Sequence, residues 1–137
     1  MIIEQLSVFS ENRSGMLADI TNKLTEADIE IDALTIADTA EFGVVRLIVD
    51  APKKALSVLK LDGYVASLTP VIALLMKHES KSLSKIAKIL GDAKISIEYL
   101  YACVARKAGT AFVVLRVEEL DEAVALLKTE DYIAYRT

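Results

Sequence analysis

The sequence predicts an α+β protein of two similar units, each with a four-stranded antiparallel sheet and two helices on one face. Strand and helix periodicities alternate in the order β-α-β-β-α-β through residues 1–69. The same order returns in residues 70–137, and self-similarity at a fixed period indicates duplicated units. A β-α-β-β-α-β unit forms the ferredoxin-like arrangement. Right-handed crossovers put its first and third strands in the centre and leave the second and fourth as edges.

The first unit reads as four short apolar strands and two amphipathic helices. The expected strands are Ile2–Phe9, Ile29–Asp38, Gly43–Val49 and Tyr64–Leu68, and the expected helices begin near Leu17 and Pro52. Apolar residues from Leu17 to Ala27 recur at helical spacing. The alternation in the second strand changes phase after Ala33, which a bulge or burial on both faces would explain. Asp50 suits the N-cap of the second helix, and a proline is tolerated in its first turn.

The second unit repeats the apolar positions of the first. Pairs that match at a shift of 66 positions include Leu17 with Leu83, Ile20 with Ile86 and Leu24 with Leu90. After a two-residue insertion near Gly109 the shift becomes 68, and it pairs Leu59 with Leu127 and Tyr64 with Tyr132. These are candidate core positions of two copies of one packing scheme. The boundary is expected near Thr69-Pro70, where proline should interrupt a continuous strand ladder.

The second strand of each unit is long and apolar, from Ile29 to Asp38 and from Ile95 to Ala105. Long apolar edge strands promote aggregation unless they are paired or covered. The simplest arrangement pairs these two strands with each other. We therefore expect one eight-stranded antiparallel sheet, shared by the two units, with helices on one face.

The composition indicates a packed globular protein and disfavours several functional classes. The chain of 137 residues has a net charge of −4 and no basic block, so it is a poor candidate for binding nucleic acid or an anionic membrane. A single cysteine, Cys103, allows no intrachain disulfide and no thiolate metal cluster. The longest purely apolar run, Val71–Met76, is too short to span a bilayer, and there is no signal-peptide pattern. We expect a cytoplasmic protein.

The stretch Glu11–Leu17 looks most like a binding site, because it joins an apolar strand to a helix through a glycine-containing turn. Amide groups at the start of a helix have no partner within the helix, and the helix dipole favours a carboxylate or another anion there. Gly15 can adopt a positive φ and lets a ligand approach the backbone closely. The side chain of Asn12 can both donate and accept hydrogen bonds. Alternatively, Asn12 and Gly15 only cap and turn the helix.

The element order and this turn resemble those of tandem ACT-domain proteins. The turn Glu11–Gly15 is similar to the Asn/Asp-x-x-Gly turn of amino-acid-sensing ACT domains. It differs only at Ser14 from the Glu-Asn-Arg-Pro-Gly of the serine-sensing regulatory domain of phosphoglycerate dehydrogenase. The resemblance covers the whole chain as two copies, and it implies a non-catalytic regulatory protein that binds an amino acid and needs no cofactor. Ser10 stands where that dehydrogenase has a serine-contacting histidine, so serine is not identified as the ligand.

The resemblance also implies which residues bind the effector, since ACT domains hold it where the first loop of one unit meets the second strand of a neighbour. In the first loop these residues are Asn12, Arg13, Ser14, Gly15, Met16 and Leu17. In the second strand they are Ile95, Ser96, Ile97, Glu98 and Tyr99. Asn12 would bond the polar groups of the ligand, and the amides near Gly15 would hold its carboxylate. A regulated enzyme and a homo-oligomer are implied as partners.

The corresponding loop of the second unit departs from this pattern. It contains His78, Glu79, Ser80 and Lys81, with His78 in the place of Asn12 and Lys81 in the place of Gly15. A side chain at the glycine position obstructs close approach of a ligand to the backbone. We therefore expect a degenerate or differently shaped second site.

No catalytic or metal-binding set is evident in the sequence. His78 with the adjacent Glu79 does not make a zinc or iron site, and Cys103 is expected to be a small buried thiol. No carboxylate pair, Cys/His pair or phosphate loop has a useful spacing, which disfavours an enzyme. Tyr99 and Tyr101 could stack on a ligand or lie in a core or interface. The alternative to a regulator is an oligomerisation or protein-docking module without a small ligand, which the long second strands would suit.

Overall fold

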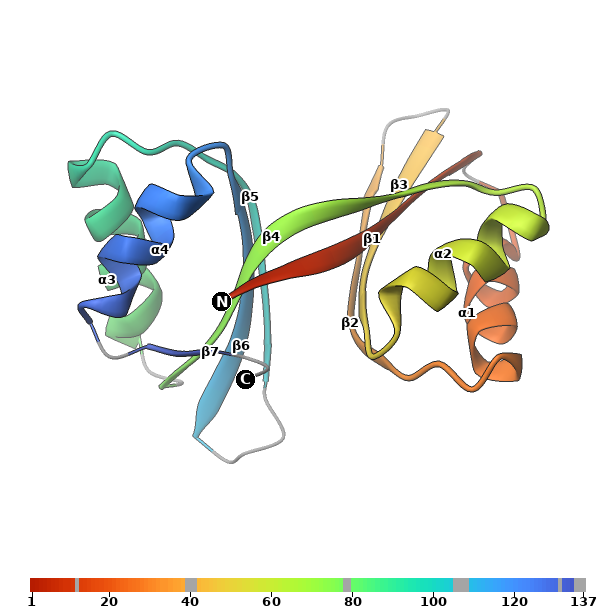
Figure 1. The fold of residues 1–137 in the computed structure, drawn as a ribbon, viewed down its shortest axis with the longest axis horizontal. Helices are drawn as coiled ribbons and strands as arrows, with labels where there is room; N and C mark the ends of the chain where they lie inside the picture. The colour runs from red at the N-terminus through yellow and green to blue at the C-terminus, as the bar shows by residue number, and fades with distance from the viewer. Residues whose placement is uncertain (12, 39–41, 78–79, 105–108, 131, 135–137) are drawn as a thin grey trace. The chain divides into compact units, whose positions relative to one another are not determined.

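The computed structural model describes residues 1–11, 13–38, 42–77, 80–104, 109–130 and 132–134. They fall into two compact units (Figure 1). The amino-terminal unit is Glu4–Thr69, and the carboxy-terminal unit is Met1–Ile3 together with Pro70–Thr137. The first three residues lie with the carboxy-terminal unit, where the Ala73 amide donates a 2.8 Å hydrogen bond to the Met1 carbonyl.

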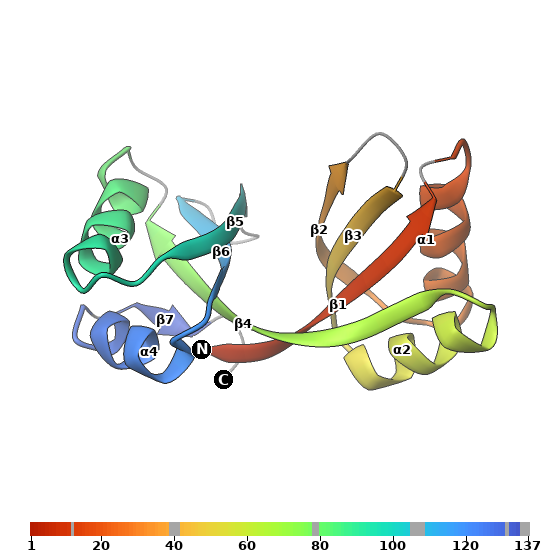
Figure 2. The same ribbon diagram turned by 90° about the horizontal axis from the view of Figure 1, so that it is seen from above.

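The amino-terminal unit contains six elements in the expected order. They are β1 (Ile2–Glu11), α1 (Met16–Glu26), β2 (Ile31–Asp38), β3 (Phe42–Val49), α2 (Pro52–Leu61) and the first part of β4 (Val65–Lys77). The strand order is β2-β3-β1-β4, and β3 pairs antiparallel with both β1 and β2. Both helices of this unit cover the same face of its sheet (Figure 2). The prediction that the first and third strands are central is confirmed.

The core of this unit lies between its sheet and its two helices. Fully buried side chains include Leu6, Ile20, Leu24, Leu47 and Leu59. Ile20 and Leu24 come from one face of α1, as the helical spacing predicts. Each fully buried leucine stabilises the fold by about 1.5–3 kcal/mol relative to an exposed one, so this layer holds the helices on the strands.

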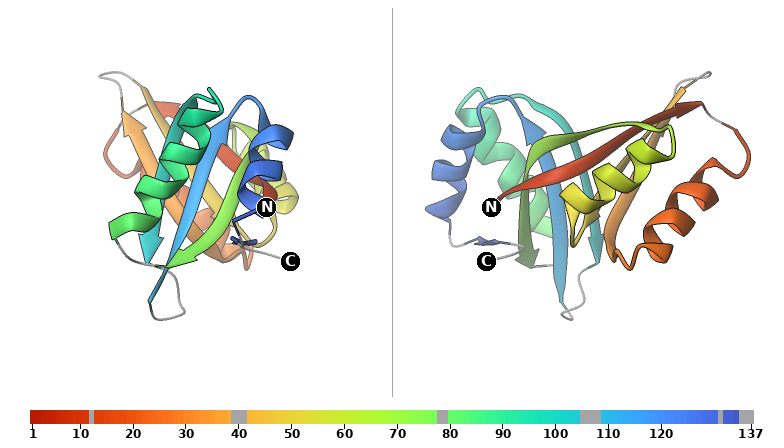
Figure 3. Two further views of the ribbon diagram at one scale, coloured as in Figure 1. Left: turned by 90° about the vertical axis from the view of Figure 1, so that its left-hand side faces the viewer. Right: turned by 45° about the vertical axis from the view of Figure 1, so that its right-hand side comes forward.

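The carboxy-terminal unit repeats the arrangement with the second part of β4 as its first strand (Figure 3). Its other elements are α3 (Ser80–Asp92), β5 (Ile97–Val104), β6 (Thr110–Val117), α4 (Leu120–Lys128) and β7 (Ile133–Ala134). Strand β4 pairs with β6 and β7, and β5 pairs with β6, all antiparallel. The core contains Ile72, Leu74, Ile86, Leu90, Leu115 and Leu127. Ile86 and Leu90 match Ile20 and Leu24 of the other unit, so the repeat read from the sequence is a repeat of core positions.

The expected eight-stranded sheet is wrong, and so is the expected break at proline. Strand β4 runs without interruption through Thr69 and Pro70, so the last strand of the first repeat and the first strand of the second are one strand. The described residues form seven strands, and the second strands β2 and β5 are the two ends of the strand order rather than partners. Proline is tolerated because pairing with β6 begins only at Ile72. The Pro70 carbonyl accepts a 3.2 Å hydrogen bond from Nη1 of Arg116.

Both second strands begin two residues later than expected, because the residues just before each strand close the end of the preceding helix. The Ile29 amide donates to the carbonyl five residues earlier, and the Ile95 amide does the same, both at 2.9 Å. Each bond closes a Schellman motif around a left-handed residue, Asp28 with φ 61° and Lys94 with φ 59°. The two helix ends are therefore the same structure in both units.

Each second strand also carries a register shift near its start. The shift lies between Ile31 and Ala33 in β2 and between Ile97 and Tyr99 in β5. The phase change in the first unit thus corresponds to an irregularity in the strand pairing.

The expected N-cap role of Asp50 is wrong. Ala51 is the N-cap of α2, and no side chain caps this helix end. Oδ1 of Asp50 instead accepts a 3.0 Å hydrogen bond from the Glu30 amide, and the Asp50 amide donates to the Glu30 carbonyl at 3.1 Å. Asp50 therefore joins the end of β3 to the segment before β2.

Candidate functional site

The first loop of the amino-terminal unit turns sharply from β1 into α1. Gly15 is the N-cap of α1 in the left-handed conformation, with φ 83°, and no side chain among the described residues caps this helix end. A Cβ atom at Gly15 would meet nothing within 4 Å. Glycine is therefore suited to this position by its backbone angle rather than by lack of space.

The described loop residues differ in what they present to solvent. Arg13, Ser14 and Gly15 are exposed, whereas Leu17 is half-buried. Met16 is only 3% exposed and belongs to the core. The Met16 amide donates to the Arg13 carbonyl at 3.2 Å. Asn12, predicted to contact the ligand, lies outside the described residues.

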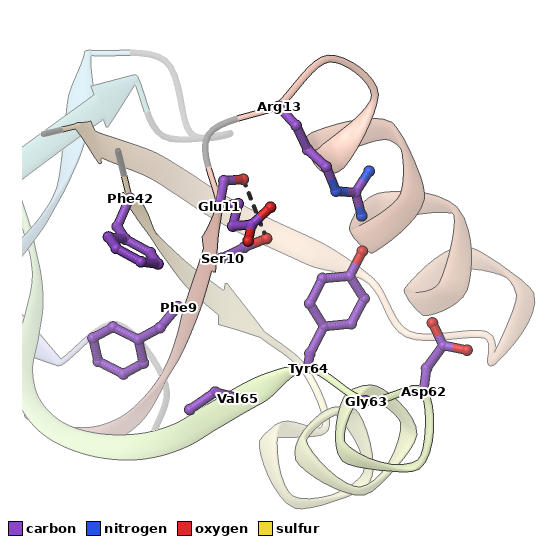
Figure 4. Close-up of a pocket in the computed structure, with 9 residues that line it drawn as sticks. All are labelled: Phe9, Ser10, Glu11, Arg13, Phe42, Asp62, Gly63, Tyr64 and Val65. Carbon is purple, nitrogen blue, oxygen red and sulfur yellow. Dashed lines mark hydrogen bonds between the residues drawn. The ribbon is translucent and has the colours of Figure 1, made fainter. Parts of the chain in front are cut away.

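A groove of about 500 Å³ lies beside this loop, entirely within the amino-terminal unit (Figure 4). The end of β1, the loop, the start of β3 and the turn between α2 and β4 contribute to it. Its lining residues are Phe9, Ser10, Glu11, Arg13, Phe42, Asp62, Gly63, Tyr64 and Val65. Of these, the sequence predicts Arg13 as a ligand-binding residue, places Glu11 in the same stretch and puts Ser10 at a ligand-contacting position of the resembled domain. Phe9 and Phe42, near the ends of two apolar strands, were the signal in the sequence that could have pointed to the rest of the groove.

Hydrogen bonds and ion pairs tie the turn after α2 to helix α1 next to the groove. The hydroxyl of Tyr64 donates to Oδ2 of Asp19. The ammonium of Lys23 lies 2.8 Å from Oδ2 of Asp62 and 3.6 Å from Oδ1 of Asp19. These contacts join the wall formed by Asp62 and Tyr64 to the helix that follows the loop.

The same contacts shift the ionisation of the groups involved. The hydrogen bond from Tyr64, assisted by Lys23 and Arg13, lowers the pKa of Asp19 below its ordinary value of 3.8. Burial and the neighbouring Asp19 carboxylate raise the pKa of Tyr64 above 10.0. Asp19 is therefore ionised and Tyr64 protonated near neutral pH, which preserves their hydrogen bond.

The elements that flank the equivalent loop of the carboxy-terminal unit lie closer together in the sequence. Strand β4 ends at Lys77, and α3 already begins at Ser80. Lys81, which replaces Gly15 in the sequence, is an exposed residue inside α3 rather than a left-handed cap. His78 and Glu79 lie outside the described residues.

The predicted strand half of the site, Ile95 to Tyr99, lies in the carboxy-terminal unit. Ile95 is buried in the core of that unit, while Ser96 and Glu98 are exposed and Ile97 and Tyr99 half-buried. Oε2 of Glu98 lies 3.6 Å from Nε of Arg116. Contact between this segment and a first loop stays a prediction.

The described residues also bear on metal binding, thiol reactivity and membrane insertion. They contain no group of three His, Cys, Asp or Glu side chains that could hold a metal ion. Cys103 is exposed, so the expected burial is wrong; its strand β5 is an end strand with a partner on one side only. Desolvation raises the pKa of the Cys103 thiol, which disfavours a nucleophilic thiolate. No helix in the described ranges is long and apolar enough to cross a bilayer.

Comparison with known proteins places this geometry in a family. A crystal structure of a protein from Bacteroides thetaiotaomicron is 33% identical, with a TM-score of 0.89 over 97% of this chain and 91% of that chain. The regulatory subunit of aspartate kinase from Thermus thermophilus shares the fold at 15% identity, with a TM-score of 0.67 over 94% and 96% of the two chains. The corresponding subunit from Thermus flavus has 15% identity and a TM-score of 0.61 over 93% and 92%. No curated protein sequence matches the chain. A family model for the ACT domain pair matches residues 1–137, and the chain belongs to this family.

Proposed function

We propose that this chain is a non-catalytic regulatory protein that binds an amino acid at the first loop of its amino-terminal unit. The observation that carries the proposal is the left-handed Gly15, which begins α1 with no side-chain cap from the described residues. Such a helix start suits a carboxylate. Membership of the ACT domain pairs and the fold shared with a regulatory subunit of aspartate kinase agree with it.

In this proposal the loop supplies one half of the site and a second strand supplies the other. Asn12 bonds the polar groups of the amino acid. The Met16 amide already donates to the Arg13 carbonyl, so the amides of Gly15 and Leu17 hold the carboxylate. The segment Ile95–Tyr99 of a neighbouring unit closes the pocket.

The proposal extends to assembly and partners. We take residues 1–69 and 70–137 as the repeated units, with one functional site per chain because the second loop has no left-handed glycine. The protein would act in the cytoplasm as a homo-oligomer and regulate a separate enzyme. The end strands β2 and β5 are the edges through which copies would associate.

Isothermal titration against the twenty amino acids tests the binding proposal. We expect one amino acid to bind with a stoichiometry of one per chain. Gly15→Ala should abolish binding, and so should Asn12→Ala. Gly109→Ala is the matched control, because Gly109 also has a positive φ, 78°, and open space around its missing Cβ. Both glycine changes cost about 1–2 kcal/mol of backbone strain, so only a role in the site separates them. The proposal fails if no amino acid binds at millimolar concentration, or if both glycine variants bind equally.

An oligomerisation or docking module without a small ligand is the second candidate. The observation that favours it is the pair of end strands, each eight residues long and free of proline. Light scattering distinguishes the two functions. A stable oligomer whose mass and thermal stability respond to none of the twenty amino acids would support the docking module.

A further inference from the structure

The groove beside the first loop has an apolar wall and a charged wall. We define the apolar wall as Phe9, Phe42 and Val65, whose side chains are 46%, 58% and 68% exposed. Figure 4 shows the two phenylalanine rings on one side of β1, and Arg13 and Tyr64 on the other. Exposed apolar groups gathered in one groove, unlike scattered ones, indicate a surface that binds something.

The apolar wall comes from adjacent strands and adjoins an acidic residue. Phe9 and Glu11 belong to β1, and Phe42 begins β3. In the register of the sheet Glu11 lies directly opposite Phe42. Cross-strand partners are close neighbours on a sheet, so a carboxylate and an exposed aromatic ring meet at this corner of the groove.

The charged residues that line the groove are Glu11, Arg13 and Asp62. Asp62 is neutralised by Lys23 at 2.8 Å. Arg13 and Glu11 form no ion pair within the described part of the chain, although the guanidinium of Arg13 acts on Asp19 and Tyr64. Among the described residues that line the groove, Arg13 is the only cation. A zwitterionic amino acid carries a carboxylate and an ammonium group on one carbon, which complements a guanidinium and a carboxylate that line the same groove.

The carboxy-terminal unit does not repeat this chemistry, although its strands have the same register. Thr110 lies opposite Lys77 there, in the places of Phe42 and Glu11. Leu75 replaces Phe9. The equivalent corner thus has a cation for the carboxylate and a hydroxyl for an aromatic ring.

We propose that the groove selects amino acids with an aliphatic or aromatic side chain, which lies on the apolar wall while Arg13 assists the loop amides in binding the carboxylate and Glu11 binds the ammonium group. This inference rests on the proposed function and names the ligand class. A volume of about 500 Å³ lies within the range of small-molecule sites. Contact with Phe42 and Phe9 supplies the affinity, and the charges set the orientation of the ligand.

Titration calorimetry with the full chain tests the inference. We expect L-leucine or L-phenylalanine to bind, and L-serine and glycine to bind at least about tenfold more weakly, because they cover no apolar wall. Phe42→Ser should weaken leucine binding by about tenfold or more. Thr110→Ser, at the equivalent register position of the other unit, should not change it. Because Phe42 is largely exposed, unchanged thermal melting will show that Phe42→Ser still folds.

Two leucine analogues test the orientation. Leucinamide lacks the carboxylate and 4-methylpentanoate lacks the ammonium group, so both should bind more weakly than leucine. Arg13→Gln should reduce the preference for leucine over leucinamide, and Glu11→Gln should remove the preference for leucine over 4-methylpentanoate. The inference is overturned, and the proposed function kept, if a polar amino acid binds at the Gly15 loop with an affinity that Phe42→Ser leaves unchanged. Absence of binding by all twenty amino acids overturns both.

Discussion

The two units share one frame and differ at the corner where the amino-terminal unit carries its candidate site. Both close the first helix with a left-handed residue, Asp28 or Lys94, and both shift register at the start of the second strand. The two units differ at the first loop, since Gly15 caps α1 in the left-handed conformation while Lys81 lies inside α3. Packing requires the shared features. A glycine in the first loop is not needed for the fold, because the carboxy-terminal unit has none from Lys77 to Ser82.

The polar contacts between the first helix and the turn after the second helix also differ between the units. In the amino-terminal unit Tyr64 donates to Asp19, and Lys23 joins Asp19 to Asp62. In the carboxy-terminal unit the residue equivalent to Asp19 is Lys85, which pairs with Glu130 at 2.8 Å. In both units a lysine of the first helix thus pairs with a carboxylate in the turn after the second helix, and the amino-terminal unit adds the Asp19 carboxylate on that helix.

Removing equivalent core leucines should produce the largest effects. Leu24→Ala and Leu90→Ala each empty a fully buried position of one core. We expect each to lower the free energy of unfolding by about 2.7–5 kcal/mol, as measured by urea denaturation. Leu61→Ala, at a position 89% exposed, should change it by less than about 0.5 kcal/mol. A large loss in one unit only would show that the two cores are not equivalent.

Relieving the left-handed helix ends should give a smaller change of opposite sign. Lys94→Gly should raise the free energy of unfolding by about 1 kcal/mol, because a lysine Cβ is unfavourable at φ 59°. Asp28→Gly should raise it less, since aspartate tolerates this region better. Thermal melting of the two variants measures the difference. Equal or reversed shifts would mean that the local backbone does not set the stability of these helix ends.

The smallest effect should come from the tyrosines, and it should depend on pH. The pKa of Asp19 is lowered in the folded protein, so its stabilising contribution is present above its ordinary value of 3.8 and is lost as pH falls through the folded value. Tyr64→Phe removes the main cause and should flatten this acid limb. Tyr132→Phe should not, because Lys85 stands in the place of Asp19. Urea denaturation at pH 3 to 6 tests this, and equal acid limbs in both variants would contradict it.

The free energy of unfolding should also depend on the tyrosines at alkaline pH. The pKa of Tyr64 is raised in the folded protein, so its contribution is present below 10.0 and is lost as pH rises through the folded value. The pKa of Tyr132 is also raised, mainly by burial. The free energy of unfolding should therefore fall at alkaline pH through both tyrosines, whereas only Tyr64 also affects it at acid pH.

The repeat and its core could be predicted from the sequence because the spacing of apolar residues follows the buried face of each element. Ile20, Leu24, Ile86 and Leu90 recur at helical intervals and all are fully buried. Strand boundaries were less predictable. Ile29 and Ile95 continue an apolar alternation, yet their amides close the preceding helices, and a hydrogen-bond partner leaves no mark on hydrophobic periodicity.

The sequence by itself determined the order of elements, the duplication, the core positions and the position of the first loop. Only the tertiary structure decided that two expected strands are the single strand β4, and that β2 and β5 end the sheet instead of pairing. It also decided that Phe9, Arg13, Phe42 and Tyr64 surround one groove. Local patterns record which face of an element is buried. Strand partners and groove walls depend on residues far apart in the chain, whose meeting is set by packing of the whole unit.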